Sequence, residues 1–205
     1  MYVPKIFEAP SIEVVRSFIE KYSFCTLVGQ HNEQPIASHI PLKLHVADDS
    51  EYLEGHIARG NIQQELFDSK QPLMAIFRDP HTYVSSSWYN HVNVPTWNYI
   101  AVHITGNASR IEGDEMLASI ERLVKTYETD GYKGFQIEQM PPEMLQRELK
   151  GIVGFRLSID KIEAAFKLSQ NRDDEDYSNI ITKLQDSEDP LSRLIAEEMK
   201  KLRTS

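Results

Sequence analysis

The densest group of side chains able to do chemistry is Lys167-Leu168-Ser169-Gln170-Asn171-Arg172, which follows a strand-like segment. Arginine offers a planar fork for phosphate or carboxylate, lysine a point charge, and serine, glutamine and asparagine both donors and acceptors. Together they would recognise an anion joined to an amide-like group. A turn that caps the next helix is an equally weighted alternative, because Asn171 and Asp173 are both favourable N-cap residues.

A second group lies where a predicted strand enters a short helix, in Gly55-His56-Ile57-Ala58-Arg59-Gly60-Asn61-Ile62-Gln63. Backbone N–H groups at the helix start, together with Arg59, would form a seat for a phosphate. The structural alternative makes Asn61 an N-cap and places Arg59 in a surface ion pair. For a loop with so few glycines, the residues alone favour the structural alternative.

Two aromatic clusters, Ser87-Trp88-Tyr89 and Val94-Pro95-Thr96-Trp97-Asn98-Tyr99, flank a loop that then enters a strand. Flat apolar rings with polar edges suit a planar heteroaromatic ligand such as a flavin. Tryptophan also anchors dimer interfaces, so packing in a core or an interface is at least as well supported. The two roles coincide if the ligand lies between subunits. The irregular stretch 79–96 is long enough to be typical of a functional segment.

The histidines and the single cysteine give no sign of metal or nucleophile chemistry. No pair of histidines has ligand spacing such as His-x-x-x-His, and none has a cysteine partner, so the sequence predicts no metal site. Cys25 lies in an apolar run and cannot form an intramolecular disulfide, which fits a reducing compartment. No nucleophile elbow, Walker loop or dinucleotide-binding glycine pattern occurs. The histidines considered are His39, His45, His56, His81, His91 and His103.

The net charge and the hydropathy of the sequence argue against nucleic-acid and membrane partners. The 205 residues carry a formal net charge of -9 without a compensating stripe of Lys or Arg, which argues against bulk DNA binding. No segment approaches the roughly 20 apolar residues that a membrane-spanning helix needs. The sequence therefore predicts a cytoplasmic protein with no membrane partner.

These groups must be positioned by a mainly β, α+β fold. Strand patterns occur at 24–29, 36–46, 52–57, 73–78, 98–111 and 151–166, with turns at 31–34 and 48–50. Helical patterns occur at 11–22, 61–67, 114–127, 141–149 and 177–203, the last broken at Asp189-Pro190. Hairpin spacing favours an antiparallel six-stranded barrel with peripheral helices. A composition shift near residue 172 predicts a barrel domain over 1–172 and a helical extension over 173–205.

Seven ordered blocks of the first 172 residues resemble the PaiB family, the FMN-binding negative transcriptional regulators. The resemblance implies a split β-barrel related to pyridoxamine phosphate oxidases, a homodimer, and FMN bound between the subunits. The blocks are Met1-Tyr-Val-Pro-Lys5, Ala37-Ser-His-Ile-Pro-Leu42, Gly55-His-Ile-Ala-Arg59, Asp79-Pro-His-Thr-Tyr-Val-Ser85, Val94-Pro-Thr-Trp-Asn-Tyr99, Lys150-Gly-Ile-Val-Gly-Phe155 and Lys167-Leu-Ser-Gln-Asn-Arg172.

The resemblance also implies a set of cofactor-binding residues, while catalytic residues stay unknown. The backbone of one strand would line the flavin, a cationic turn would hold the phosphate, and the strand-end group would close the site, from the same or the other subunit. Trp97 would pack beside it. The implied residues are His39, Ile40 and Pro41 for the flavin, Arg59, Asn61 and Gln63 for the phosphate, and Lys167, Ser169 and Gln170 for closure.

Four functions follow, three of them with a flavin or haem. The family name implies negative control of transcription, in the namesake case over protease synthesis and sporulation, although no helix-turn-helix with a basic face is found and DNA contact is not supported by charge. The main alternative is a flavin-dependent oxidoreductase acting on a small metabolite, with His39 or His81 as proton donor. Haem handling is a third. The fourth is a barrel without ligand that serves as an interaction module.

Overall fold

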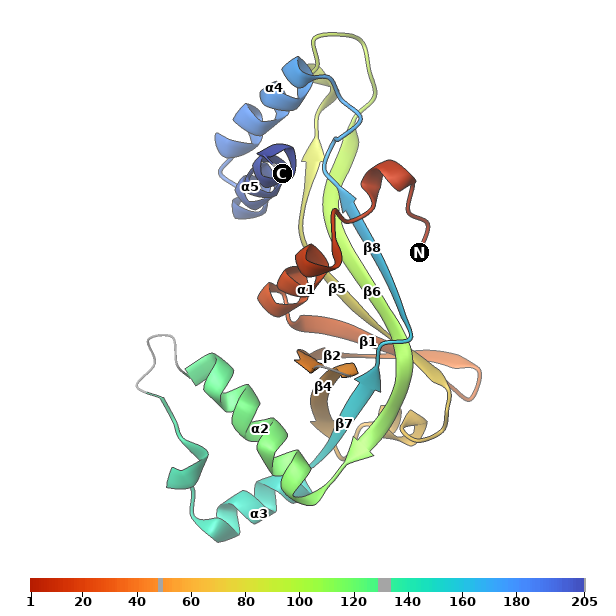
Figure 1. The fold of residues 1–205 in the computed structure, drawn as a ribbon, viewed down its shortest axis with the longest axis vertical. Coiled ribbons are helices and arrows are strands. Elements are labelled where there is room, and N and C mark those ends of the chain that lie inside the picture. The colour runs from red at the N-terminus through yellow and green to blue at the C-terminus, as the bar shows by residue number, and fades with distance from the viewer. Residues whose placement is uncertain (48–49, 129–133, 205) are drawn as a thin grey trace. The chain divides into compact units, whose positions relative to one another are not determined.

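The computed structural model describes residues 1–47, 50–128 and 134–204. It is mainly β, and helices are joined to the sheet by short connections (Figure 1). In chain order the elements are η1 (Lys5–Phe7), α1 (Ile12–Lys21), β1 (Phe24–His31), β2 (Gln34–Pro41), β3 (Lys43–Ala47), β4 (Ser50–Ala58), η2 (Ile62–Leu66), β5 (Pro72–Val84), η3 (Ser86–Trp88), β6 (Thr96–Ile111), α2 (Gly113–Glu128), η4 (Ile137–Gln139), α3 (Pro142–Lys150), β7 (Ile152–Ser158), β8 (Lys161–Lys167), α4 (Asp174–Gln185) and α5 (Pro190–Thr204).

The strands form one sheet in the order β2-β1-β5-β6-β7-β4-β3, with β8 paired to β6. The registered pairs, such as β1 with β2 and β4 with β7, are antiparallel, as the hairpin spacing predicted. The path starts at β2 and ends at β3, and no pairing closes it among the described residues. The sheet has eight strands where six were predicted.

The two extra strands arise because two predicted strands are each interrupted. The pattern 36–46 breaks at Leu42, which is buried and donates its backbone N–H to the Ser23 carbonyl at 2.9 Å. The pattern 151–166 breaks before Lys161, where Asp160 N donates to Thr105 O at 3.0 Å. At both points the amide is satisfied outside a regular ladder, which the alternation of apolar residues does not reveal. The predicted turn 48–50 lies, at residues 48 and 49, outside the described residues.

Strand β5 is longer than predicted and continues to Val84, so the irregular stretch begins later. The predicted strand ended at Arg78 because residues 79–96 show no clear period. Every second side chain is buried on both sides of Arg78 and Asp79, but the buried positions shift by one residue there, from Leu73, Ala75 and Phe77 to Pro80, Thr82 and Val84. The strand therefore continues past the proline after a local break in its alternation.

The chain divides into two compact units, each made of segments far apart in sequence. Unit 1 contains Met1–Tyr22, Phe77–His103 and Glu163–Ser205, and unit 2 contains Ser23–Ile76 and Ile104–Ile162. Strands β5, β6 and β8 contribute residues to both.

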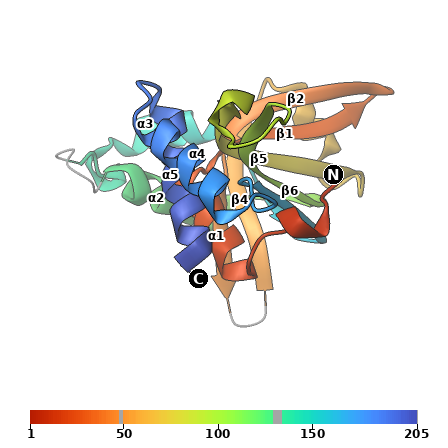
Figure 2. The ribbon, with the colours of Figure 1, turned by 90° about the horizontal axis from the view of Figure 1, so that it is seen from above.

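Unit 1 is built on helices packed by apolar faces. Ser11 caps α1, its Oγ accepting from Val14 N at 3.4 Å, and Phe18 of this helix contacts the Phe166 ring edge-on at 5.8 Å between centroids. Helices α4 and α5 lie side by side (Figures 1 and 2). Tyr177 is buried between them and donates from its hydroxyl to the Met199 carbonyl at 2.8 Å. The predicted break at Asp189-Pro190 separates the two helices, but both bury apolar side chains.

Unit 2 holds the registered strand pairs β1–β2, β3–β4 and β4–β7. Its core includes Leu27, Leu53 and Phe155, all fully buried. Glycine is required at position 106 of β6 by the close approach of the backbone, since a Cβ there would lie 1.8 Å from the Ser158 carbonyl oxygen.

None of the helices in the described ranges is long and apolar enough to cross a membrane.

Candidate functional site

The predicted site residues fall into two groups, one in each unit. Unit 1 holds the strand-end group and the aromatic residue, and unit 2 holds the flavin-lining strand and the phosphate turn. The unit 1 residues are Trp97, Lys167, Ser169 and Gln170, and the unit 2 residues are His39, Ile40, Pro41, Arg59, Asn61 and Gln63.

Lys167, at the end of β8, is positioned by the start of β6. Its Nζ donates to Thr96 Oγ1 at 2.6 Å, and the side chain is partly buried. Burial lowers the pKa of Lys167 below its ordinary value, and the positive charge of Arg172 lowers it further. The ammonium group therefore lies where an anion would stabilise its charge.

Ser169 is buried and donates from Oγ to Asn98 Oδ1 at 2.9 Å. Asn98 is one pleat along β6 from Thr96, so the two β6 side chains that hold the strand-end group point to the same face. Gln170 is folded back on its own turn: its Oε1 accepts from Leu168 N at 2.8 Å and its amide donates to the Phe166 carbonyl. The segment is thus a tightly hydrogen-bonded turn, which fits the structural alternative while leaving Lys167 at its edge.

Arg172 closes the same segment and stacks on an aromatic ring. Its guanidinium carbon lies 4.6 Å from the centroid of the Tyr89 ring. The Nε of Arg172 and the hydroxyl of Tyr89 are buried without a hydrogen-bond partner. Buried polar groups are normally satisfied, so these two donors indicate a missing acceptor.

Trp97 points to the opposite face of β6 from Thr96 and Asn98, because neighbours along a strand alternate. The ring is 52% exposed and lies between two side chains of β5. The His81 and Tyr83 ring centroids are 6.1 and 5.8 Å from it. These three residues form an exposed aromatic face, which is a surface suited to a planar ring or to another protein.

In unit 2, Asn61 acts as the N-cap of η2, its Oδ1 accepting from Gln63 N at 2.9 Å. Its amide donates to Ser38 Oγ on β2 at 2.7 Å. Gln63 is buried and donates from Nε2 to Leu27 O at 3.0 Å, while its Oε1 has no hydrogen-bond partner. Asn61 and Gln63 thus hold η2 against β2 and β1. They would therefore affect ligand binding by fixing the position of the turn.

Arg59 lies just after β4 and reaches the junction of α3 and β7. Its Nε donates to Lys150 O at 2.7 Å and its Nη2 to Ile152 O at 2.8 Å. A guanidinium has five N–H donors, so others stay available for an anion. Arg59 also lines a pocket of about 330 Å³ together with Arg110 and Lys150. The sequence predicted neither the pocket nor the carbonyl contacts, because both depend on chain segments far from Arg59.

His39, Ile40 and Pro41 lie on β2, at one end of the sheet order, paired with Thr26, Cys25 and Phe24 of β1. His39 is exposed, and its Nδ1 lies 3.1 Å from Thr26 Oγ1. Thr26, Thr96 and Asn98 were not predicted as site residues. Thr96 and Asn98 belong to the resembling block Val94–Tyr99, which is the signal that could have identified these two.

Fold and residues together define an FMN-binding split-barrel protein. The chain belongs to the family described as "Putative FMN-binding domain", whose model matches residues 1–161. The protein called "Protease synthase and sporulation protein PAI 2" of Bacillus subtilis is 42% identical to this chain over 199 residues, covering 97% of this chain and 96% of that protein. An uncharacterized protein of Saccharomyces cerevisiae is 29% identical over 140 residues, covering 56% of this chain and 82% of that protein. The family resemblance is confirmed.

Solved structures show the same fold at low sequence identity. The flavocytochrome Anf3 of Azotobacter vinelandii matches with a TM-score of 0.59 at 16% identity, covering 86% of this chain and 78% of that one. The FAD and haem binding protein of Mycobacterium smegmatis matches with a TM-score of 0.56 at 16% identity, covering 83% and 78%. The predicted α+β split-barrel class is confirmed, and the flavin cofactor is confirmed at the level of the family.

The residues present fit an FMN phosphate and a polar ring edge. In unit 2, Arg59 is a cation that could pair with a phosphate. In unit 1, Lys167 is a second cation, and the buried Nε of Arg172 has no hydrogen-bond acceptor. The exposed aromatic face of Trp97 supplies a flat apolar surface. The donor set is therefore compatible with the cofactor that the family name gives.

Proposed function

We propose that the protein is an FMN-binding flavoprotein in which Arg59 pairs with the phosphate of the cofactor and Lys167, from the same or the other subunit, closes the site. The observation that carries the proposal is the partly buried Lys167, fixed by Thr96 beside an Arg172 whose Nε has no acceptor. An anion placed there would relieve both the charge repulsion and the missing hydrogen bond. His39, Ile40 and Pro41 would contribute through the β2 backbone, Asn61 and Gln63 through the η2 turn, and Ser169 and Gln170 by holding the strand end.

The cofactor, when bound, supplies one- and two-electron redox chemistry. The chain's residues bind and orient it. We propose that the exposed aromatic face of His81, Tyr83 and Trp97 packs against a second copy of the chain. The homodimer would then shield the flavin ring from water. We also propose that the protein acts in the cytoplasm.

The biological role is proposed from the Bacillus subtilis relative, whose printed name refers to protease synthesis and sporulation. Because this chain covers almost all of that protein, we propose a negative regulatory role of the same kind. The net charge of -9 opposes phosphate backbones, so regulation would act through a small molecule or a partner protein rather than by strong DNA binding. Salt-sensitive, sequence-specific DNA binding at nanomolar concentration would contradict this.

The second candidate is an oxidoreductase, favoured by a histidine on the aromatic face. His81 Nδ1 lies 3.3 Å from Asp79 Oδ1, and its ring neighbours Trp97. A carboxylate at this distance orients the imidazole, and an oriented imidazole is a group that can transfer protons to or from a substrate. Turnover of NADH by the FMN-loaded protein that is lost in His81→Gln with FMN affinity retained would support it. Unchanged turnover in that variant would remove His81 from the mechanism.

The deciding experiment is titration of the apoprotein with FMN, followed by tryptophan fluorescence and by visible flavin absorbance. We expect saturable binding, weakened by about tenfold or more in Lys167→Ala and in Arg59→Ala, since a lost charge-assisted hydrogen bond costs roughly 1.5–3 kcal/mol. Lys183→Ala and Arg147→Ala, on exposed helical positions of units 1 and 2, are the matched controls. No binding by the parent would favour the interaction module, and parental affinity in both site variants would overturn the residue assignment.

A further inference from the structure

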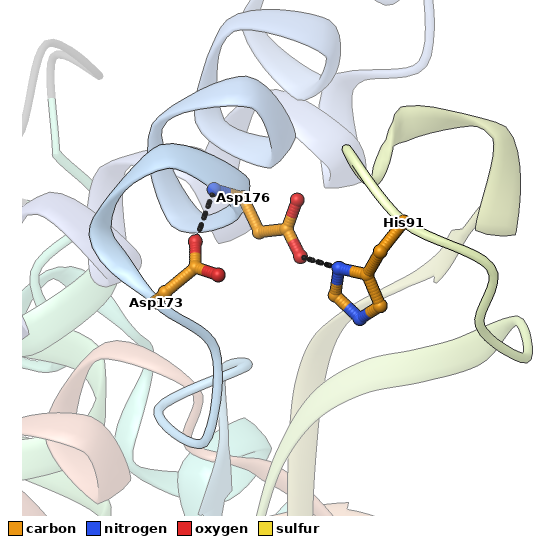
Figure 3. Close-up of side chains that lie close together, drawn as sticks. All are labelled: His91, Asp173 and Asp176. Atoms are coloured by element: carbon orange, nitrogen blue, oxygen red, sulfur yellow. Dashed lines mark hydrogen bonds and ion pairs between the residues drawn. The ribbon is translucent and has the colours of Figure 1, made fainter.

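A histidine and two aspartates that the flavin proposal does not use meet at the start of α4. His91 comes from the loop between η3 and β6, Asp173 is the N-cap of α4, and Asp176 lies in its first turn. One ligand atom from each lies within 4.8 Å of the others (Figure 3). All three residues belong to unit 1.

Asp176 is the unusual member of this cluster because its side chain is 0% exposed. Its Oδ1 accepts a hydrogen bond from Asn90 N at 2.8 Å, whereas its Oδ2 is buried and accepts none. Figure 3 shows that Oδ2 faces the His91 ring, whose Nδ1 lies 3.3 Å away. A buried carboxylate oxygen that is aimed at a nitrogen ligand and lacks a hydrogen bond is costly unless a proton or a cation completes it.

We propose that His91, Asp173 and Asp176 form a binding site for a divalent transition ion of the zinc class. Zinc takes nitrogen and oxygen ligands at about 2.0–2.2 Å, which places neighbouring ligand atoms of a tetrahedron about 3.3–3.6 Å apart. The separation of 3.3 Å between His91 Nδ1 and Asp176 Oδ2 matches one edge. A small rotation of the exposed Asp173 carboxylate supplies the third ligand, and water supplies the fourth.

The surrounding groups hold the ligands in place. The Asn90 amide donates to Glu175 Oε2 at 2.9 Å, which directs its own oxygen to His91 Nδ1 at 2.9 Å. The other ring nitrogen, Nε2, lies 2.9 Å from Asn93 Nδ2. A metal on Nδ1 would replace the hydrogen bond from this nitrogen to the Asn90 oxygen and leave the ring proton on Nε2, so the Asn93 amide would have to turn and present its oxygen. The hydrogen-bond partner of the nitrogen that does not bind the metal selects the tautomer of a metal-bound histidine.

The site is reachable and its charge is suitable. The His91 side chain is 48% exposed, so an ion can enter from solvent. Two carboxylates neutralise a divalent cation, and Asp174 and Glu175 add negative charge in the same helical turn. A bound ion would link the loop after η3 to the first turn of α4, two segments that are otherwise joined by the Asn90 contacts.

The test is calorimetric titration of the full-length, tag-free protein with ZnCl₂, with and without FMN. Two variants remove one ligand each: His91→Ala changes an exposed loop residue, and Asp173→Asn removes a carboxylate while keeping an N-cap residue. His31→Ala is the matched control, because His31 also pairs with a single carboxylate, Glu65, at 2.9 Å. Thermal unfolding of each variant without metal checks that the fold is intact.

We expect one zinc ion per chain in the parent and in His31→Ala. The affinity for zinc should be at least tenfold lower in both ligand variants, because loss of even a hydrogen-bond partner of a metal ligand lowers metal affinity by about 10- to 100-fold. Zinc should also raise the melting temperature of the parent and not of His91→Ala. Absence of zinc binding by the parent, binding of Mg²⁺ or Ca²⁺ alone, or equal affinity in the ligand variants would overturn the site and leave a plain His91–Asp176 ion pair. The result is independent of whether FMN binds.

Discussion

Ser169 and Asn98 are joined by a buried hydrogen bond of 2.9 Å from Ser169 Oγ to Asn98 Oδ1. Ser169 adopts φ +61, a conformation that favours glycine. The bond fixes the turn that follows Lys167 to strand β6. The strand-end group is therefore set by a structural contact that its own sequence does not contain.

Replacing Ser169 by alanine should lower the free energy of unfolding by about 1–3 kcal/mol, because Asn98 Oδ1 would be left buried without its donor. Denaturant unfolding measures this change. Ser178→Ala, which removes an exposed hydroxyl in the same unit, should change stability by less than about 0.5 kcal/mol. Equal losses of stability in both variants would show that the hydrogen bond from Ser169 to Asn98 does not stabilise the fold more than an exposed hydroxyl does.

Replacing Glu54 by glutamine should also lower the free energy of unfolding. Its 2% exposed carboxylate accepts from Arg122 Nη2 at 2.6 Å and from Arg156 Nε at 3.0 Å. Breaking a buried pair costs roughly 3–5 kcal/mol, but Arg122 is 41% exposed and water would replace part of the loss, so we expect about 2–3 kcal/mol. Glu115→Gln, which breaks an exposed pair with the same Arg156, should cost below about 1 kcal/mol. The comparison uses the same denaturant titration, and similar losses in both variants would contradict it.

Stability should decrease as the pH falls through the histidine range. Burial lowers the pKa of His56 below its ordinary value, because it disfavours the imidazolium. As the pH falls below about 6.5, the unfolded chain binds a proton that the folded chain does not, so protonation favours unfolding. Unfolding measured between pH 8 and pH 5 should show a smaller decline for His56→Gln than for the parent. A decline that is identical in both would exclude His56 as its source.

Cys25 should be unreactive in the native protein. The side chain is buried, and burial raises the pKa of its thiol to about 12, so almost no thiolate forms at neutral pH. A chromogenic disulfide reagent should therefore release little product before denaturant is added and one equivalent per chain afterwards. Prompt reaction of the folded protein would show that the β1 region opens readily.

The sequence alone was sufficient for the fold class, the family and the main elements. Alternating apolar residues predicted the strands, and apolar residues at helical spacing over 11–22 predicted α1, because these features depend on near neighbours in the chain. It missed the strand breaks at Leu42 and Asp160, whose amides donate to distant carbonyls. The resembling blocks named most of the candidate flavin residues, and their roles stay predictions.

Only the tertiary structure decided which side chains meet. It brought the His81 and Tyr83 rings beside Trp97, and it directed Arg59 to the carbonyls of Lys150 and Ile152. The sequence predicted no metal site because its histidines have no ligand spacing such as His-x-x-x-His and no cysteine partner. Chain folding brings Asp176 beside His91, and the low-dielectric environment of the buried Asp176 carboxylate strengthens its interaction with a nearby positive charge. Local pattern fixes which residues are available, and long-range packing fixes their distances and their solvation.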